Sequence, residues 1–401
     1  MAKNYIDMSA VVNSASKQLV NGEQIANLDT SDVVSVGNAY RNSGRTNDNI
    51  YDTIVDKVGE YIIANEVWSP KLLKMFRNSW DFGLLLEELR VRTVEAVDDP
   101  SQHPVSGQRY ADSLTKYDAV DVVAKYYNSN AGFQLVHWRP EDQLWTAFKS
   151  NEHMQRFLDA IGIAIKNSMT KKLTAMAKAC LGTMIARTMY KAAPAGNYGA
   201  VTGLLGVNIE KLYNDLHPGA TVTAEQILNS TAPESFYRFA GQIINERADY
   251  LTDISDQFNI DGEEEQTTYD NLNVVLLSKF ANAMNFNLYN AQNQFDSSLI
   301  KLPTYDTVTS WQATEAYDVG VLSEVMSKFE DNDGTVHTVE MTGVIGVAYD
   351  IRAVAITCER KILTSFYHPD LNQRKFFDKY SGGYLNNTGK NFIVFYVADA
   401  A

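Results

Sequence analysis

The longest regular pattern in the sequence is a run of apolar residues spaced three or four positions apart between residues 150 and 191. Steps of three and four place side chains on one face of an α-helix, and no proline interrupts the run, so the pattern predicts one helix over 150–191. Such a helix would be about 60 Å long at 1.5 Å per residue. Ser150 or Asn151 is the expected N-cap. The stripe comprises Met154, Phe157, Ile161, Ile165, Met169, Leu173, Met176, Cys180 and Met184.

Before this helix, the pattern changes to one typical of strands. Residues 84–97 (LLLEELRVRTVEAV) alternate apolar and polar positions in their second half, and residues 114–138 are rich in β-branched and aromatic side chains. The polar segment DDPSQHPVSGQ (98–108) separates them. Together they predict a long two-stranded hairpin over 83–138. A hairpin of this length is not stable by itself, so another surface must pack on it.

The remaining segments predict a mixed α+β protein. Residues 1–47 are polar with little periodicity, which indicates an extended arm ordered by a neighbour, and apolar residues in 50–62 predict a short helix. Further helices are expected over 234–250 and within KFANAMNF (279–286), with a buried strand in NLNVVLLS (271–278) between them. Residues 339–356 are expected to be strand-rich, and KYSGGYLNNTGKNFIVFYVA (379–398) is expected to form a hairpin.

Composition restricts the function classes. The 401 residues are 45% hydrophobic and 21% charged, as in ordered proteins, and the 11% share of aromatic residues suits large subunit contacts as well as cores. A net charge of -14 argues against a sequence-specific DNA reader. The sequence has neither a signal-peptide pattern nor a membrane-spanning apolar window, so we expect a soluble protein made in the cytoplasm. Two distant cysteines, Cys180 and Cys358, offer neither a disulfide framework nor a metal site.

The densest group of chemically active residues lies in VHWRPEDQLWTAFKSNEHMQ (136–155). A metal site is disfavoured because Glu152 and His153 are adjacent and point about 100° apart on a helix. Acid–base catalysis is disfavoured because Glu141 and Asp142 should be solvated at an exposed junction. The favoured interpretation is a strand-to-helix junction anchored by Trp138, Trp145 and Phe148, with both tryptophans expected to be buried.

Three other segments resemble known sites without completing them. Residues 331–340 (DNDGTVHTVE) match later positions of a calcium loop, but Phe329 occupies the first position, so a β-hairpin turn at Asp333–Gly334 is favoured. The glycines of 196–206 lack a following Gly-Lys-Ser/Thr and predict a flexible connection. The acidic run 263–265 is expected to be a solvated loop. No catalytic, cofactor-binding or metal-ligating residue is predicted.

The order of these elements resembles the Hong Kong 97-type major capsid fold of tailed bacteriophages and herpesviruses, and most closely the major head proteins of the short-tailed phi-29-like phages. The resemblance is carried by NDNIYDTIVDKVGEYII (47–63), PKLLKMF (70–76), LLEELRVRT (85–93) and, above all, VVAKYYNSNAGFQLVHWRPEDQLWTAFKS (122–150). KFANAMNFN and AYDI in the second half are fainter matches. An immunoglobulin-like C-terminal domain, a cross-linking Lys and Asn pair and a large scaffolding segment find no counterpart in the sequence.

The resemblance implies the following organisation: an N-arm (1–47), the start of a peripheral domain (48–82), an E-loop hairpin (83–138), a peripheral domain with its spine helix (139–222), an axial domain (223–345) and returning strands (346–401). It implies a structural protein that self-assembles into hexamers and pentamers of a phage head around double-stranded DNA. Its partners would be its own copies, a separate scaffolding protein, a portal protein and packaged DNA held non-specifically, without a membrane or cofactor. The virion would be assembled in the host cytoplasm.

The E-loop is expected to contact neighbouring subunits. The contact residues expected on its strands and tip are Leu86, Arg90, Arg92, Val97, Asp98, Asp99, Pro100, Gln108, Tyr117 and Val120. Two alternatives remain open from the sequence, another virion lattice protein such as a tail tube or sheath subunit and, less favoured, a cytoplasmic hydrolase.

Overall fold

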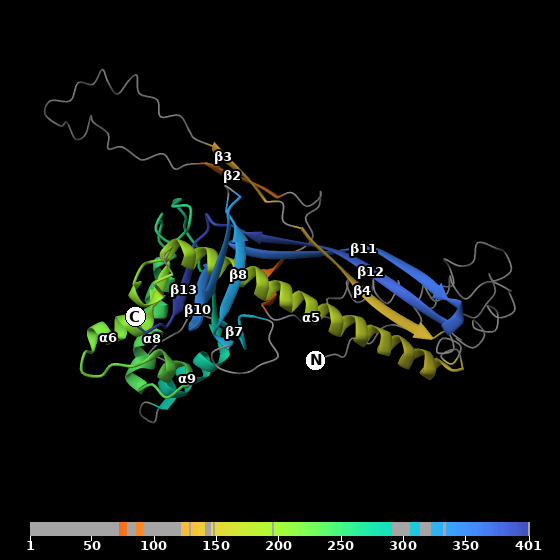
Figure 1. Cartoon of the computed structure of the whole chain (residues 1–401), viewed down its shortest axis with the longest axis horizontal. Coiled ribbons are helices and arrows are strands. Elements are labelled where there is room, and N and C mark those ends of the chain that lie inside the picture. Colours follow the sequence, from red (N-terminus) through yellow and green to blue (C-terminus); the bar gives the residue numbers. More distant parts are fainter. Residues whose placement is uncertain are drawn as a thin grey trace, which may run out of the picture. The chain divides into compact units, whose positions relative to one another are not determined.

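The computed structural model describes residues 72–77, 86–91, 122–127, 130–140, 146, 149–194, 196–290, 305–312, 322–331 and 334–399. Figure 1 shows its helices and strands. The chain divides into two units, each built from separate stretches of sequence. Unit 1 comprises Met1–Ser79, Asn130–Ala179 and Ile356–Gly383, and unit 2 comprises Trp80–Ser129, Cys180–Ala355 and Tyr384–Ala401. The arm expected over 1–47, the helix expected near 50–62 and the hairpin tip 98–108 lie outside the described residues.

Helix α5 (Asn151–Ala192) confirms the long helix predicted from the apolar stripe. Ser150 caps it, because its Oγ accepts a hydrogen bond from the backbone N–H of His153 at 3.3 Å. In its first part only one face is buried, including Met154, Ile161 and Ile165. From Cys180 onward nearly every residue is buried or half-buried, so the second part is a core helix.

Unit 1 contains a four-stranded sheet in the order β1-β11-β12-β4. Strand β4 (Asn130–Pro140) pairs antiparallel with β12 (Gln373–Asn386), and β1 (Phe76–Arg77) pairs parallel with β11 (Val354–His368). The short 3₁₀ helices η1 (Leu73–Met75) and η4 (Pro369–Leu371) and the first part of α5 also belong to this unit. On β12 the side chains of Arg374, Phe376, Asp378 and Tyr380 alternate into the buried side of the sheet.

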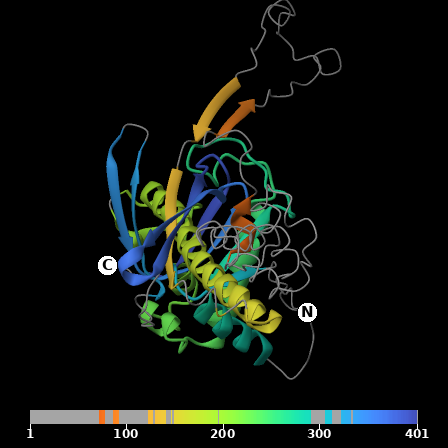
Figure 2. The ribbon, with the colours of Figure 1, turned by 90° about the vertical axis from the view of Figure 1, so that its right-hand side faces the viewer.

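The first part of α5 lies along β4 (Figures 1 and 2). The Lys172 ammonium is 5.7 Å from the centre of the Phe133 ring, and Phe133 in turn stacks on Tyr380 with ring centroids 5.2 Å apart. The two faces of β4 differ. Phe133 and His137 are half-buried and stack on Tyr380 and Phe376 of β12, while Val136 and Trp138 point to the exposed face.

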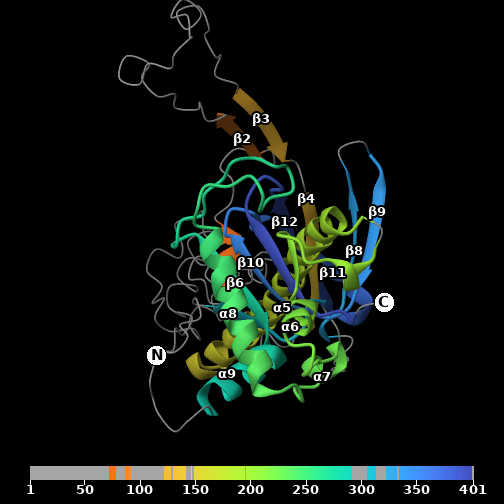
Figure 3. The same cartoon turned by 90° about the vertical axis from the view of Figure 1, so that its left-hand side faces the viewer.

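Unit 2 is built around a five-stranded mixed sheet in the order β5-β13-β10-β6-β7. Its strands are β5 (Gly206–Asn208), β6 (Leu272–Leu277), β7 (Tyr305–Val308), β10 (Val344–Asp350) and β13 (Phe392–Tyr396). The central strands are continuous runs of buried apolar residues, as expected where both faces of a sheet are covered. Around the sheet lie η3 (Tyr198–Ala200), α6 (Ile209–Leu216), α7 (Ala224–Leu228), α8 (Glu234–Tyr250) and α9 (Ser278–Asn290), seen in Figure 3.

Two further pairs of strands belong to unit 2. Strand β2 (Leu86–Val91) pairs antiparallel with β3 (Val122–Tyr127), and we call this pair the ribbon. Strand β8 (Val325–Glu330) pairs antiparallel with β9 (Val336–Met341).

The local predictions for helices and buried strands are confirmed. Helix α8 spans the predicted residues 234–250, β6 is the predicted buried strand, and α9 follows it directly. The β8–β9 hairpin confirms a turn in place of a calcium loop: Gly334 has a φ of +82°, and Phe329 is a buried strand residue packed with Ala186 and Val339. The glycine-rich segment is partly ordered in the sheet, since Gly206 begins β5.

Two predictions of strand pairing are wrong. The predicted returning strand 114–138 is divided, because β3 pairs with β2 whereas β4 pairs with β12 through the register Asn130↔Gly383 to Pro140↔Gln373. The predicted hairpin over 379–398 does not form either. Strand β13 lies between β5 and β10, so both of its edges are already occupied, and β12 enters the other sheet.

Candidate functional site at the base of the ribbon

The ribbon is attached to the rest of unit 2 by an ion-pair cluster that includes residues from both of its strands. Glu88 of β2 and Lys125 of β3 are opposite each other in the register, so their side chains point to the same side of the ribbon. The Lys125 ammonium lies 2.6 Å from Asp261 Oδ2 and 2.6 Å from Glu263 Oε1. Burial lowers the pKa of Lys125, but hydrogen bonds to these carboxylates and their charges outweigh it and raise the pKa above its ordinary value.

Glu88 binds the segment between β12 and β13. One of its carboxylate oxygens lies 3.3 Å from Lys390 Nζ, and the other accepts a hydrogen bond from the Asn387 amide. Lys390 Nζ also contacts Glu265 Oε1 at 2.9 Å, and the Lys390 side chain is only 9% exposed. The ammonium thus lies between two carboxylates that come from segments about 180 residues apart.

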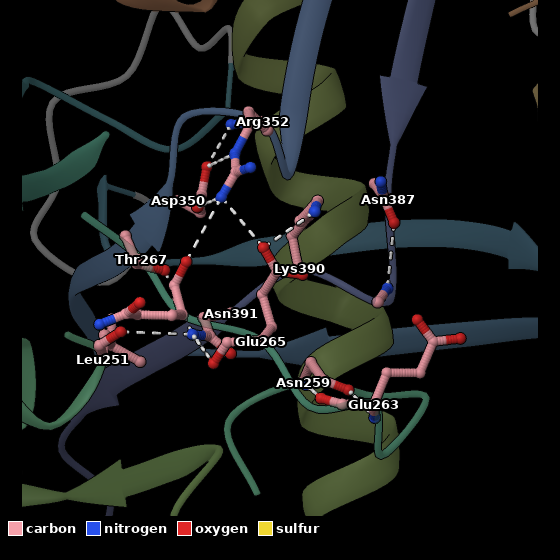
Figure 4. Close-up of polar contacts among 12 residues, drawn as sticks. Leu251, Asn259, Glu263, Glu265, Thr267, Asp350, Arg352, Asn387, Lys390 and Asn391 are labelled. Atoms are coloured by element: carbon pink, nitrogen blue, oxygen red, sulfur yellow. Dashed lines mark hydrogen bonds and ion pairs between the residues drawn. The ribbon is translucent and has the colours of Figure 1, made fainter. Parts of the chain in front are cut away.

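Arg352, in the turn after β10, completes the cluster (Figure 4). Its guanidinium lies 2.6 Å from Asp350 Oδ2 and 3.0 Å from Glu265 Oε1. Asp350 is fully buried, and its hydrogen bond to Arg352 raises the pKa of the guanidinium above its ordinary value. Glu265 accepts from both Arg352 and Lys390, so the two cations are joined through one carboxylate, and removing Arg352 would leave the buried Asp350 without its cation.

Asparagine side chains hold the loop that carries the carboxylates. Asn391 Nδ2 donates to Thr267 Oγ1 at 3.2 Å, and at 3.4 Å to the backbone oxygens of Leu251 and Glu265 (Figure 4). Asn259 donates to the Glu263 backbone oxygen and accepts from its N–H. The positions of the acidic residues are therefore fixed by the backbone as well as by the ion pairs.

The prediction that residues 263–265 form a solvated loop is wrong for Glu265, whose side chain is 13% exposed. The sequence shows only an acidic run, because the cations that bury it, Lys390 and Arg352, come from other parts of the chain. No periodicity or spacing links these residues, so the cluster had no signal in the sequence.

The cluster joins the ribbon to the rest of unit 2 through ion pairs and hydrogen bonds. Within the described residues, His, Cys, Asp and Glu side chains nowhere converge in groups of three or more that could hold a metal ion. Burial raises the pKa of the thiols of Cys180 and Cys358 to about 12, so neither is a thiolate near neutral pH. Of the helices in the described ranges, none has the length and apolar character needed to cross a bilayer.

Few of the contact residues predicted from the sequence fall within the described part of the chain. Leu86 and Arg90 lie on β2, and the structure describes their backbone positions. Trp138 lies on β4, where the prediction that it is buried is wrong: it is 60% exposed, because it alternates to the outward face of the strand. Outside the described residues lie Arg92, Val97, Asp98, Asp99, Pro100, Gln108, Tyr117, Val120, Trp145 and Phe148.

Comparison with known proteins identifies the family. The model of the family described as Phi29-like phage major capsid protein matches residues 8–396 of the chain. The chain belongs to this family. It is therefore the major capsid protein of a phage head, a structural component of the virion. None of the curated proteins matches the capsid protein significantly in sequence.

Among solved structures, the capsid protein is similar to a chain of the Staphylococcus phage Andhra capsid, with 9% identity and a TM-score of 0.47 over 82% of this chain and 85% of that chain. A chain of the bacteriophage PhiM1 mature capsid has 10% identity and a TM-score of 0.41, with coverages of 82% and 88%. A chain from Microbacterium phage Oxtober96 has 12% identity and a TM-score of 0.42, with coverages of 82% and 92%. The family membership follows from the match to the family model over residues 8–396, and not from these structural similarities.

Proposed function

We propose that this capsid protein self-assembles into hexamers and pentamers that close into a shell around the double-stranded DNA genome. The observation that carries the proposal is the family match over residues 8–396. In the Hong Kong 97-type arrangement that the sequence resembles, the ribbon is the base of the E-loop and α5 is the spine helix. A separate scaffolding protein and a portal protein would take part in assembly, which would occur in the host cytoplasm.

The two faces of the ribbon support a contact with a neighbouring subunit. Glu88 and Lys125 attach one face to their own subunit. On the opposite face Leu89 is 65% exposed, Val122 is 55% exposed and Tyr126 is 60% exposed. Burying a large apolar side chain contributes roughly 1.5–3 kcal/mol. A second copy that covers this face would supply the packing that a two-stranded ribbon needs.

Unit 1 has a surface that could receive such a ribbon. The outward face of its sheet has Val136 45% exposed, Trp138 60% exposed and Phe366 61% exposed, beside the exposed Lys375 and Lys379. We propose that the ribbon of one copy lies on this sheet face of the next. The ribbon face of one copy then meets the sheet face of the next, which is a heterologous contact. Contacts of this kind close into a ring when the rotation from one subunit to the next divides a full turn evenly.

The contact residues predicted from the sequence extend this interface beyond the described part of the ribbon. Asp98 and Asp99 at the tip would complement the lysines of the sheet face. Arg92, Val97, Pro100, Gln108, Tyr117 and Val120 would add contacts along the strands. Many modest interfaces per subunit sum to a shell that is hard to dissociate.

The proposal is tested by negative-stain microscopy of the protein co-expressed with its scaffolding protein. We expect closed shells from the wild type and none from Leu89→Ser/Val122→Ser, because that variant removes the apolar ribbon face. The control is Leu216→Ser/Tyr269→Ser, which changes exposed side chains elsewhere in unit 2 and should leave shells intact. Tubes would favour a tail protein, and a small oligomer of uniform size under all conditions would contradict the capsid assignment.

A further inference from the structure

Charge is distributed unequally between the two units of the chain. Unit 1 has 20 basic and 16 acidic residues, a net charge of +4, whereas unit 2 has 15 basic and 33 acidic residues, a net charge of -18. The net positive charge of unit 1 attracts a polyanion such as DNA, whereas the net negative charge of unit 2 repels it. Contacts with DNA phosphates are therefore expected on unit 1, although the whole chain is acidic.

Within unit 1, the positive charge is concentrated on the first part of α5, residues 151–179, which has five basic and two acidic residues; the rest of the helix, with Arg187 and Lys191, belongs to unit 2. The helix has seven basic and two acidic residues, and no Asp or Glu occurs between Asp159 and Glu210. The six basic residues of this acid-free stretch are Lys166, Lys171, Lys172, Lys178, Arg187 and Lys191. The usual pairing of lysine with glutamate four positions away is therefore impossible along most of the helix.

The exposed side of α5 is suited to a close approach by a duplex. Ala160, Ala164, Asn167 and Ser168 are exposed and small, with Ile163 as one larger exposed side chain among them, and they are followed by the exposed Lys171 and Lys172. Among the described residues, no ion pair involves Lys171 or Lys172; the Lys172 ammonium has the Phe133 ring beside it at 5.7 Å. Lys171 continues the exposed side of the helix, and Lys172, about 100° further round, extends the positive charge toward β4, where its ammonium lies beside the Phe133 ring.

We propose that residues 160–172 of α5 bind the phosphate backbone of the packaged duplex. Lys171 and Lys172 supply the main phosphate contacts of this strip. This face of unit 1 is then the lumenal face. Binding is independent of DNA sequence, because lysines reach phosphates rather than base edges. The inference deepens the proposed enclosure of DNA and rests on it for its biological setting.

The test measures binding of the purified subunit to a fluorescent 30-base-pair duplex by anisotropy as NaCl is raised. The variant is Lys171→Gln/Lys172→Gln, and the matched control is Lys74→Gln/Lys149→Gln, which makes the same charge change at exposed lysines elsewhere in the same unit. Each lost phosphate contact should reduce the slope of log K against log salt by about 0.9. We expect the α5 variant to lose about 1.8 in slope and roughly 10–60-fold in affinity at 0.1 M salt.

The control should stay within about twofold of the wild type, and Lys171→Arg/Lys172→Arg should bind as the wild type does, since phosphate contacts depend chiefly on charge. Equal losses in both glutamine variants, or no salt-dependent binding by the wild type, would overturn the proposal. So would an α5 variant that binds duplex normally but no longer forms shells with the scaffolding protein, because the strip would then be a protein contact. A failure of the wild type to form shells would refute the proposed function and leave the duplex measurement valid.

Discussion

Glu210 provides the sharpest test of the electrostatics of the fold. It lies in the first turn of α6 and is 3% exposed. Burial, followed by the hydrogen bond and negative charge of Asp399, raises the pKa of Glu210 to about 8. Asp399 is held nearby, because its Oδ1 accepts a hydrogen bond from the Ala224 N–H at 3.1 Å. Near neutral pH the Glu210 carboxyl is therefore mostly protonated in the folded chain and ionised in the unfolded chain.

This difference makes the stability of the fold depend on pH. A carboxyl whose pKa is raised by folding favours the folded state fully below its unfolded pKa, and that contribution is lost as pH rises through the interval up to the folded pKa. Here the interval extends from 4.5 to about 8. From these two pKa values, the ionisation of Glu210 lowers the free energy of unfolding by about 4 kcal/mol at pH 7.5 and by less than about 1 kcal/mol at pH 5. Because Asp399 is exposed and water reaches its side of the pair, we expect about half of the larger figure, ~2 kcal/mol.

The perturbation is Glu210→Gln, which keeps the shape and a hydrogen-bond donor for Asp399 but cannot ionise. We expect the free energy of unfolding to rise by about 2 kcal/mol at pH 7.5 and to change by less than about 0.5 kcal/mol at pH 5. The assay is urea unfolding of the unassembled subunit, followed by tryptophan fluorescence, because Trp311 is buried in the same unit. Asp399→Asn should give a smaller gain, since burial is the larger cause of the shift. An equal gain at both pH values, or a loss at pH 7.5, would refute the reasoning.

Three further outcomes follow from the structure. Lys390→Met should destabilise unit 2 by about 1–3 kcal/mol and speed hydrogen exchange of β2, because Glu88 loses its ion-pair partner and Glu265 keeps only Arg352; Arg156→Met, which breaks an exposed pair on α5, should cost less than about 1 kcal/mol in the same measurement. Gly343→Ala should prevent folding or lower the melting temperature steeply, because Gly343 has a φ of +86° and an added Cβ would lie 2.1 Å from the Val397 oxygen; an unchanged melting temperature would contradict that conformation. Deleting residues 98–108 should leave a folded subunit by circular dichroism but impair shell formation or shell stability; normal shells with unchanged heat resistance would refute the role of this segment between subunits.

Elements with a complete local pattern were predictable from the sequence. The apolar stripe of α5, its Ser150 cap and the limits of α8 all follow from interactions between residues three or four positions apart. The buried strand β6 was recognisable as a short apolar run. The family resemblance was also predictable, because it is carried by contiguous stretches such as residues 122–150.

The tertiary structure alone decided which strands pair and which charges meet. Strand β4 has the same alternation whether it pairs with β2 or with β12, and only the fold brings residues 130–140 beside residues 373–383. The same holds for Glu265, because its solvation depends on Lys390 and Arg352, which are 125 and 87 residues away. The local sequence determines whether a segment has the apolar spacing of a helix or of a strand. Which other segments pair with it or bury it depends on the fold of the whole chain, because those segments are distant in sequence.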